Sequence, residues 1–366
     1  MKFGVVFFPT VGPADKPAEQ YFDEALRLVR LAEELGFDHV KIVEHYFFSY
    51  GGYSPDPVTF LAAAASVTER VRLGTSATIP AFQHPVKLAG KLAMLDNISR
   101  GRLDAAFGRA FLPDEFDAFG VPLDESKERF QENVRAIKRL WTEENLVWEG
   151  RFHRFGPVTL LPRPVQTPHP PVFVTTARSA ESCAEAGRAG HHLQTVPNVM
   201  STDELRRRLA LYRAEWAAAG HPPGAERVHF SYPCVVAPDA EEARRKGRWD
   251  DERNTAAIAA AVASWRDTRS AAYPGYEKLV EATRRSHFDD KLAAGKLLVG
   301  DPDQVREQLE RIAGWFGDSI AISLGVHSGH LTFEDAATTL RLMADQVLPK
   351  LAAGGTAAAV PRTDGT

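Results

Sequence analysis

Cysteine is scarce in this 366-residue chain, which has only two, and no apolar run approaches the length needed to cross a membrane. Cys183 and Cys234 lie far apart, which excludes a disulfide framework and fits no metal-ligand spacing. We therefore expect two reduced thiols in the core of a cytoplasmic protein. Residues 2–8 are largely apolar, but Pro9 follows at once, so we expect a buried first strand and no signal peptide.

An excess of positive charge is also missing. The chain has 44 Lys and Arg against 48 Asp and Glu, which gives a net charge of −4. Nucleic acids and anionic membranes select basic stripes, so we expect neither as a partner. The glycine-rich signatures of dinucleotide and P-loop folds, the nucleophile elbow of hydrolases and the paired-histidine metal motifs are absent as well. The sequence therefore predicts no metal ion and no nicotinamide site.

What the chain does have is a repeated alternation of strand and helix patterns. Short apolar strands are expected at 2–8, 39–43, 71–75, 103–107, 172–176, 192–196, 228–236 and 319–324. Helical periodicity lies between or after them, at 18–35, 57–68, 86–97, 126–141, 202–219, 333–351 and from 180 onward. Strand–helix units joined by short links are typical of a parallel sheet. Eight such strands predict an α/β fold, a (β/α)₈ TIM barrel with insertions.

Four segments depart from this alternation of strands and helices. Residues 146–153 indicate a turn with a small hairpin, and the proline-dense 161–171 predicts an extended connector. Residues 240–296 are too long for one barrel helix, so we expect an insertion of two or three helices that forms a lid near the barrel mouth. We expect one domain over 1–352 and a disordered tail over 353–366.

Polar residues directly follow several of the expected strands. In a barrel, such positions converge on one face, where the chemistry takes place. His45 follows the second strand, and it is either a catalytic residue or a histidine that only bonds a loop backbone. Its neighbour Glu44 should point the other way or into the barrel floor.

Two later strand ends suggest an anion site. Arg109 follows the fourth strand and could hold a phosphate with its planar fork, or form a surface salt bridge. The turn at 177–182 opens a helix with small hydroxylated residues, so its backbone N–H groups could cradle a phosphate. The same residues equally fit a simple helix cap formed by Ser179.

A set of short motifs occurs in a fixed order along the chain. They are Met1–Gly4, Gly36–Asp38, Glu44–His45, Ile79–Pro80, His84–Val86, Leu95–Arg102, Arg109, Asp114–Gly120, Pro168–Pro171, Ala177 with Ser179, Val299–Pro302 and Val347–Pro349. With these motifs, the chain resembles the bacterial luciferase-like family of flavin-dependent monooxygenases over nearly its whole length. The resemblance implies a TIM barrel that uses reduced FMN and dioxygen or, in some branches, a reduced deazaflavin.

The resemblance also assigns roles to residues. His45 matches an active-site histidine near the reactive edge of the flavin. Ser76 and Ala77 match the strand end behind the isoalloxazine ring, often joined by a non-proline cis peptide. Phosphate-binding positions match Arg109, Arg178, Ser179, Ala180 and Ser182.

The expected substrate is a small apolar or aromatic molecule. Tyr46 stands where luciferases often have a second histidine, and the aromatic residues after it argue against a long-chain aldehyde. We expect substrate contacts from Phe8, Tyr46, Tyr53 and His84. The family implies a separate flavin reductase and a homodimer or higher homo-oligomer, and the composition suggests secondary-metabolite tailoring. Two alternatives stay open: a deazaflavin-dependent reductase or dehydrogenase, and a non-catalytic flavin-binding partner subunit.

Overall fold

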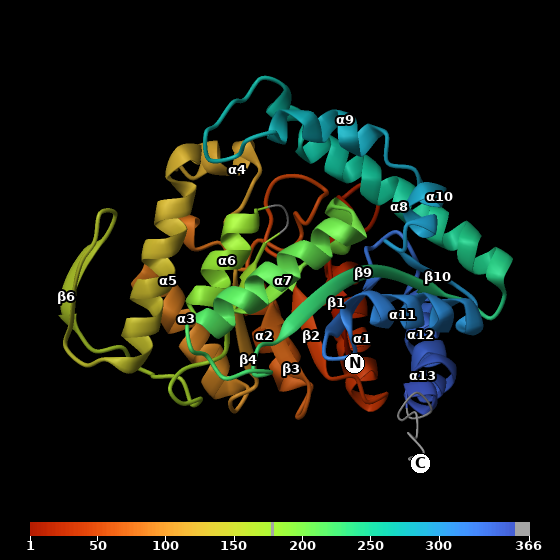
Figure 1. The fold of residues 1–366 in the computed structure, drawn as a ribbon, viewed down its shortest axis with the longest axis horizontal. Helices are drawn as coiled ribbons and strands as arrows, with labels where there is room; N and C mark the ends of the chain where they lie inside the picture. The colour runs from red at the N-terminus through yellow and green to blue at the C-terminus, as the bar shows by residue number, and fades with distance from the viewer. Residues whose placement is uncertain (177–178, 356–366) are drawn as a thin grey trace, which may run out of the picture.

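The computed structural model describes residues 1–176 and 179–355, and eight parallel strands in it close into a barrel (Figure 1). Strand β1 pairs with both β2 and β11, and β9 pairs with both β8 and β11, so the ring has no open edge. The barrel strands are β1 (Lys2–Phe7), β2 (His39–Ile42), β3 (Arg72–Thr75), β4 (Leu103–Phe107), β7 (Val172–Thr175), β8 (His192–Thr195), β9 (Val228–Val236) and β11 (Ala321–His327). The predicted TIM barrel is confirmed.

Alternation along each strand separates an outer apolar layer from a polar interior. In β2, Val40 and Ile42 belong to the large hydrophobic core that packs under the helices. The alternate residue Lys41 reaches across the barrel to side chains of β8 and β9. Because side chains of a strand point to opposite faces in turn, the same short sequence builds both layers.

Helices surround the barrel on its outside (Figure 1). They are α1 (Ala18–Glu34), α2 (Pro57–Ser66), α3 (Pro85–Ile98), α5 (Ser126–Thr142), α6 (Ala180–Arg188), α7 (Thr202–Ala218), α11 (Pro302–Phe316), α12 (Phe333–Leu342) and α13 (Leu348–Gly355), the last two joined by a π-helical turn at Met343–Val347. The start of β1 and the end of α13 lie at the same end of the barrel (Figure 1). The expected tail over 353–366 falls mostly outside the described residues.

A short hairpin and a proline-rich connector interrupt the barrel between β4 and β7. Strands β5 (Leu146–Glu149) and β6 (Arg154–Val158) form the hairpin, which lies to one side of the barrel in Figure 1. The Glu132 carboxylate anchors its turn by accepting hydrogen bonds from the backbone N–H groups of residues 151–153. The connector at 161–171 has no helix or strand, as its prolines predict.

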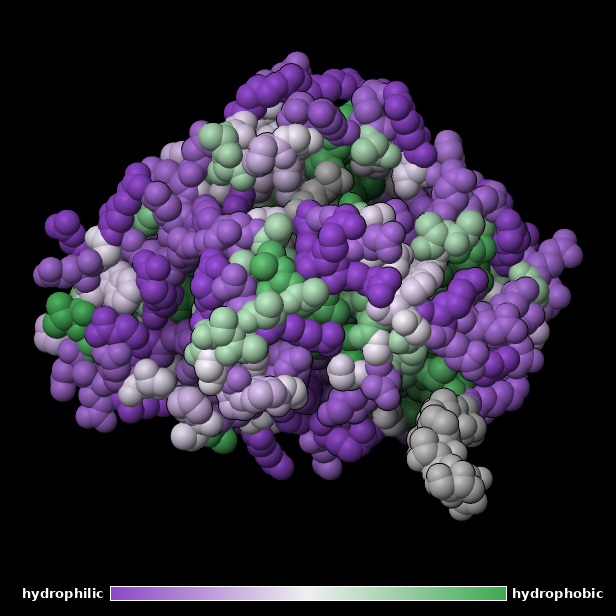
Figure 2. All heavy atoms as spheres, viewed as in Figure 1, coloured by the Kyte–Doolittle hydropathy of each residue, from purple (hydrophilic) through white to green (hydrophobic). Residues whose placement is uncertain are grey.

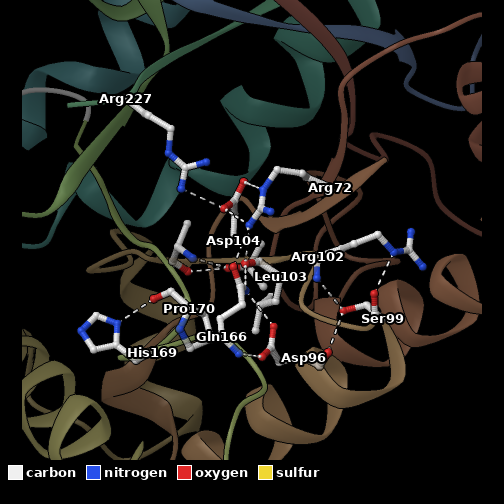
Figure 3. A network of polar contacts seen from close by, with 12 residues as sticks. Arg72, Asp96, Ser99, Arg102, Leu103, Asp104, Gln166, His169, Pro170 and Arg227 are labelled. Carbon is white, nitrogen blue, oxygen red and sulfur yellow. Dashed lines mark hydrogen bonds and ion pairs between the residues drawn. The ribbon is translucent and has the colours of Figure 1, made fainter. Parts of the chain in front are cut away.

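The amino-terminal end of the barrel is closed by a charged network (Figure 3). Asp104 is buried and accepts hydrogen bonds from Arg72 at 2.7 and 3.0 Å and from Arg227 at 3.1 Å. Gln166 of the connector joins this network by accepting a hydrogen bond from Arg72. The carboxylate of Asp96 accepts from the backbone N–H and the side-chain amide of Gln166. The network therefore fixes the connector to the barrel floor.

At the other end of the barrel, the segment after β9 forms an arch (Figure 1). It contains α8 (Ala240–Ala261), 3₁₀ turns at Ala263–Arg266 and Tyr276–Lys278, α9 (Leu279–Arg284) and α10 (Phe288–Ala293). The first part of α8 packs closely on a ninth strand, β10 (Leu298–Gly300), because a Cβ at Gly247 would lie 2.6 Å from Val299. Figure 2 shows apolar side chains beneath this arch on an otherwise largely hydrophilic face.

Candidate active site

His45 follows β2 at the end of the barrel that the arch covers, and a buried carboxylate holds it there. Its Nδ1 lies 3.0 Å from Oε1 of Glu115, which belongs to α4 (Pro113–Ala118) and has no exposed surface. The backbone N–H of Tyr46 donates to the same oxygen at 2.9 Å. Because Oε1 already acts as an acceptor toward the Tyr46 N–H, we assign Nδ1 of the imidazole as the donor to the same oxygen. Nε2 is thereby left as the basic nitrogen.

Aromatic rings surround the imidazole of His45. The ring centroids of Phe8, Tyr50 and Phe111 lie 5.7, 4.9 and 5.9 Å from its own. Only 8% of His45 is exposed. The imidazole is therefore almost fully buried among aromatic rings and is held in position by Glu115. The contact with Glu115 was not foreseen, although Glu115 lies within the noted motif Asp114–Gly120.

Of the two orientations expected for Glu44, the structure shows the one that points away from His45 and not the one into the barrel floor. Its carboxylate accepts a hydrogen bond from the Tyr46 hydroxyl at 2.7 Å and from the Ile79 N–H at 3.1 Å. Burial raises the pKa of Glu44 to about 8, against the opposing effect of these two hydrogen bonds. Glu44 thereby fixes the ring of Tyr46, which packs against Phe119 with centroids 4.8 Å apart.

Ser76 and Ala77 continue from the end of β3 and are joined by a cis peptide bond. The Ser76 N–H donates to the carbonyl of Ile42 at 2.8 Å, which ties this segment to β2 beside His45. A Cβ at Gly108 would lie 3.3 Å from the Cβ of Ala77. Gly108 therefore lets the ends of β3 and β4 approach closely.

Arg109 is directed at the arch. Its guanidinium lies 4.4 Å from the centroid of the Tyr273 ring and donates to the carbonyl of Ala272. The Tyr273 hydroxyl in turn donates to the carbonyl of Ala110 at 3.0 Å. Within the described part of the chain, Arg109 has no carboxylate partner. Its position thus joins the end of β4 to the segment over the mouth.

The start of α6 shows the expected cap. The Ser179 hydroxyl accepts from the N–H of Ser182 at 3.1 Å, and Ala180 opens the helix. Arg178 lies outside the described residues. Beside this turn, a cavity of about 10 Å³ has room for one water molecule. Its lining includes Thr195 and Arg208, and the Thr195 hydroxyl and one Arg208 nitrogen are buried without a hydrogen-bond partner among the described residues.

The donors near the start of α6 are of the kind that bind a phosphate group. The helix start supplies backbone N–H groups. Arg208 donates from Nε to Glu204 at 2.8 Å, and its Nη1 is buried without a partner among the described residues. Phosphate oxygens would satisfy such donors, since a buried polar group without a partner costs about 1–3 kcal/mol.

Two of the four residues expected to contact the substrate, Tyr53 and His84, lie away from His45. The Tyr53 hydroxyl donates to the carbonyl of Lys16 at 2.8 Å, and its ring faces Tyr21 of α1. His84 caps α3, is exposed and packs against His153 beside the hairpin. Neither ring packs against His45, whereas Phe8 does. Tyr46 shares the carboxylate of Glu115 with His45 through its backbone N–H. The reason is local: a turn at Gly51–Gly52 brings Tyr53 back toward α1, and the capping bond fixes His84 outside.

The described residues contain neither a cluster of metal ligands nor a membrane-spanning helix. No three His, Cys, Asp or Glu side chains of residues 1–176 and 179–355 come together as metal ligands would. Over the same residues, no helix combines the length and apolarity that a membrane span requires.

Comparison with known proteins agrees with the barrel fold. The model of the luciferase-like monooxygenase family matches residues 1–319. The crystal structure of monooxygenase RslO1 from Streptomyces bottropensis is 54% identical, with a TM-score of 0.87 and coverage of 96% of this chain and 99% of that one.

Two curated relatives are flavin-dependent enzymes by name. The oxygenase component of a flavin-dependent trigonelline monooxygenase from Acinetobacter baylyi is 27% identical over 344 residues, 90% of each chain. An FMNH2-dependent dimethylsulfone monooxygenase from Pseudomonas putida is 31% identical over 60% of this chain and 59% of its own. Deazaflavin-dependent enzymes are also among the similar proteins. Because the family model spans most of its length, the chain belongs to the luciferase-like monooxygenase family.

Proposed function

We propose that the protein is the oxygenase component of a two-component, FMN-dependent monooxygenase. It would take reduced FMN from a separate reductase and use dioxygen to place one oxygen atom in a small aromatic or apolar substrate. The second oxygen atom would leave as water, and FMN would leave oxidised. The observation that carries this proposal is the Glu115–His45 pair within an aromatic pocket.

The residues at the mouth suit the binding of FMN. Ser76 and Ala77 would lie along its ring, and the α6 start with Arg208 would hold its phosphate, with Arg109 as a further candidate once it leaves the arch. Reduced FMN supplies two electrons to dioxygen when it is bound. The name of the Acinetobacter relative, an oxygenase component, supports the arrangement with a separate reductase.

His45 would hold or move a proton at Nε2. Glu115 keeps Nδ1 protonated and fixes the ring, so the basic nitrogen stays in one place. Phe8, Tyr50 and Phe111 exclude water around it, which limits loss of the activated oxygen as hydrogen peroxide. Tyr46 and Phe119 extend the aromatic surface, which favours a planar aromatic substrate. A homo-oligomer, a cytoplasmic location and a role in secondary-metabolite tailoring remain predictions.

An anaerobic titration followed by admission of oxygen tests this proposal. Reduced FMN and reduced deazaflavin would each be added without oxygen, and the absorbance would then be recorded as oxygen enters. We expect reduced FMN to saturate the protein and to be reoxidised with consumption of oxygen. Saturation by the deazaflavin alone, with hydride transfer and no oxygen uptake, would instead support the dehydrogenase alternative that similar proteins represent.

A further inference from the structure

The interior of the barrel below the mouth carries more cations than anions. Arg72 and Arg227 share the single carboxylate of Asp104, so that group of three already has a net positive charge. Lys41, which is only 1% exposed, adds another cation. Its Nζ donates to Gln194 Oε1 at 2.6 Å and to His229 Nδ1 at 2.5 Å, and both are neutral acceptors. Among residues 1–176 and 179–355, no carboxylate is therefore in direct contact with Lys41.

Lys41 is connected to the site by two hydrogen bonds. Its stem crosses Gly74 of the neighbouring strand, where a Cβ would lie 3.0 Å from its Cγ. From there it reaches Gln194 on the far side of the barrel, and the Gln194 amide donates to the carbonyl of Thr75 at 3.1 Å. Thr75 directly precedes Ser76. The ammonium group thus lies beneath the strand end assigned to the flavin ring.

A charged ligand that binds above Lys41 can change the protonation of its ammonium group. Burial lowers its pKa to about 7, an effect that Asp104 opposes and Arg227 reinforces. The other titratable or charged side chains that face this interior are His39, Arg72, His192 and His229. Burial lowers the pKa of His39, His192 and His229, so at neutral pH these histidines add no further positive charge. A negative ligand above this layer would hold the proton on Lys41.

We propose that Lys41 makes the protein select reduced over oxidised FMN by stabilising the negative charge that the reduced ring carries. This inference rests on the proposed function. Oxidised FMN becomes the anionic reduced form by taking up two electrons and one proton, so only the reduced ring brings a new negative charge to the mouth. A buried cation in a poorly screened interior favours that form. Lys41 acts as a positioning residue through Gln194 and through its field, without contact with the reacting oxygen.

The experiment compares the affinities of oxidised FMN and of dithionite-reduced FMN under argon. We expect the wild-type protein to bind reduced FMN at least tenfold more tightly. Lys41→Met, which removes the charge and keeps the length, should lower this ratio about tenfold. That change equals a fall of about 30 mV in the two-electron potential of bound FMN. Lys138→Met, which removes a lysine of α5 outside the barrel, is the matched control and should leave the ratio unchanged.

Several outcomes would overturn the inference. If wild-type protein binds both forms equally, Lys41 does not select the reduced form, and this result needs no variant. An unchanged ratio in Lys41→Met would have the same meaning. If that variant does not fold, Lys41→Gln, which is polar and uncharged, replaces it with the same expected loss. If wild-type protein binds neither form, the proposed function fails and this inference fails with it.

Discussion

The imidazole of His45 has one nitrogen occupied by Glu115, so any proton it transfers must pass through the other. We predict that His45→Ala keeps FMN affinity within about threefold, because the residue lies away from the start of α6 and Arg208, where the phosphate is proposed to bind. Product formation should fall by on the order of a hundredfold, the usual effect of a positioned proton-transfer group. Product, oxygen uptake and hydrogen peroxide would be measured together, with peroxide rising as product falls. Normal coupling in the variant would make His45 a structural residue.

Glu44 allows a prediction about pH. Its pKa of about 8 lies above the value of about 4.3 expected in the unfolded chain, so the folded state binds more protons between these values. Glu44 therefore favours folding less as the pH rises, and its contribution changes by up to about 3 kcal/mol between pH 6 and pH 8. Glu44→Gln cannot ionise. Urea unfolding should show a smaller loss of stability from pH 6 to pH 9 in the variant, and parallel curves would refute the assignment.

Arg109 permits a test that separates the phosphate from the ring. Arg109→Ala should weaken FMN about tenfold and leave riboflavin almost unchanged, since a charge-assisted contact contributes about 1.5–3 kcal/mol. Isothermal titration with both ligands would measure this. Equal losses for FMN and riboflavin would instead assign Arg109 to the arch, where its contact with Tyr273 already lies.

At the scale of elements, the eight barrel strands could be predicted because apolar runs and short links identify them directly. Strand β10 and helix α11 were not predicted. Strand β10 has only three residues, and α11 begins at a capping box formed by Asp301 and Gln304, which is a short signal. His45 could be placed from its strand end. Its partner Glu115 could not, because a contact across 70 residues of sequence leaves no local pattern.

The arch is the element expected to move. Trp265 and Tyr273 pack against Leu112 and Phe116 in a small cluster that is separate from the main core, so few contacts need to open. Limited proteolysis should cut within 262–279 first, and reduced FMN with substrate should slow this cleavage. Tyr273→Phe, which loses the hydroxyl bond to Ala110, should be cut faster than wild type. Resistance that is the same with and without ligand would identify a fixed wall.

At the scale of the whole molecule, the network around Asp104 holds the barrel floor together. Burial disfavours its charge, but hydrogen bonds and charges from Arg72 and Arg227 outweigh this and lower its pKa. Its contribution to stability is thus present above the unfolded value of about 3.9 and is lost as the pH falls below it. Asp104→Asn should lower the free energy of unfolding at pH 7 by about 3–5 kcal/mol, because two arginines lose their partner.

Urea denaturation measures this loss, with Asp117→Asn as the control, since that carboxylate is exposed on α4. A change below about 1 kcal/mol in Asp104→Asn would show that the network contributes little to the fold.

The start of β1 and the end of α13 share one end of the barrel, away from α8 and α9 (Figure 1). A solid support or a fused protein attached near either point would therefore stand behind the catalytic face. Flavin, oxygen and substrate would still diffuse freely to that face. The protein could therefore be immobilised, or fused to a reductase, without blocking the access of small molecules to the catalytic face.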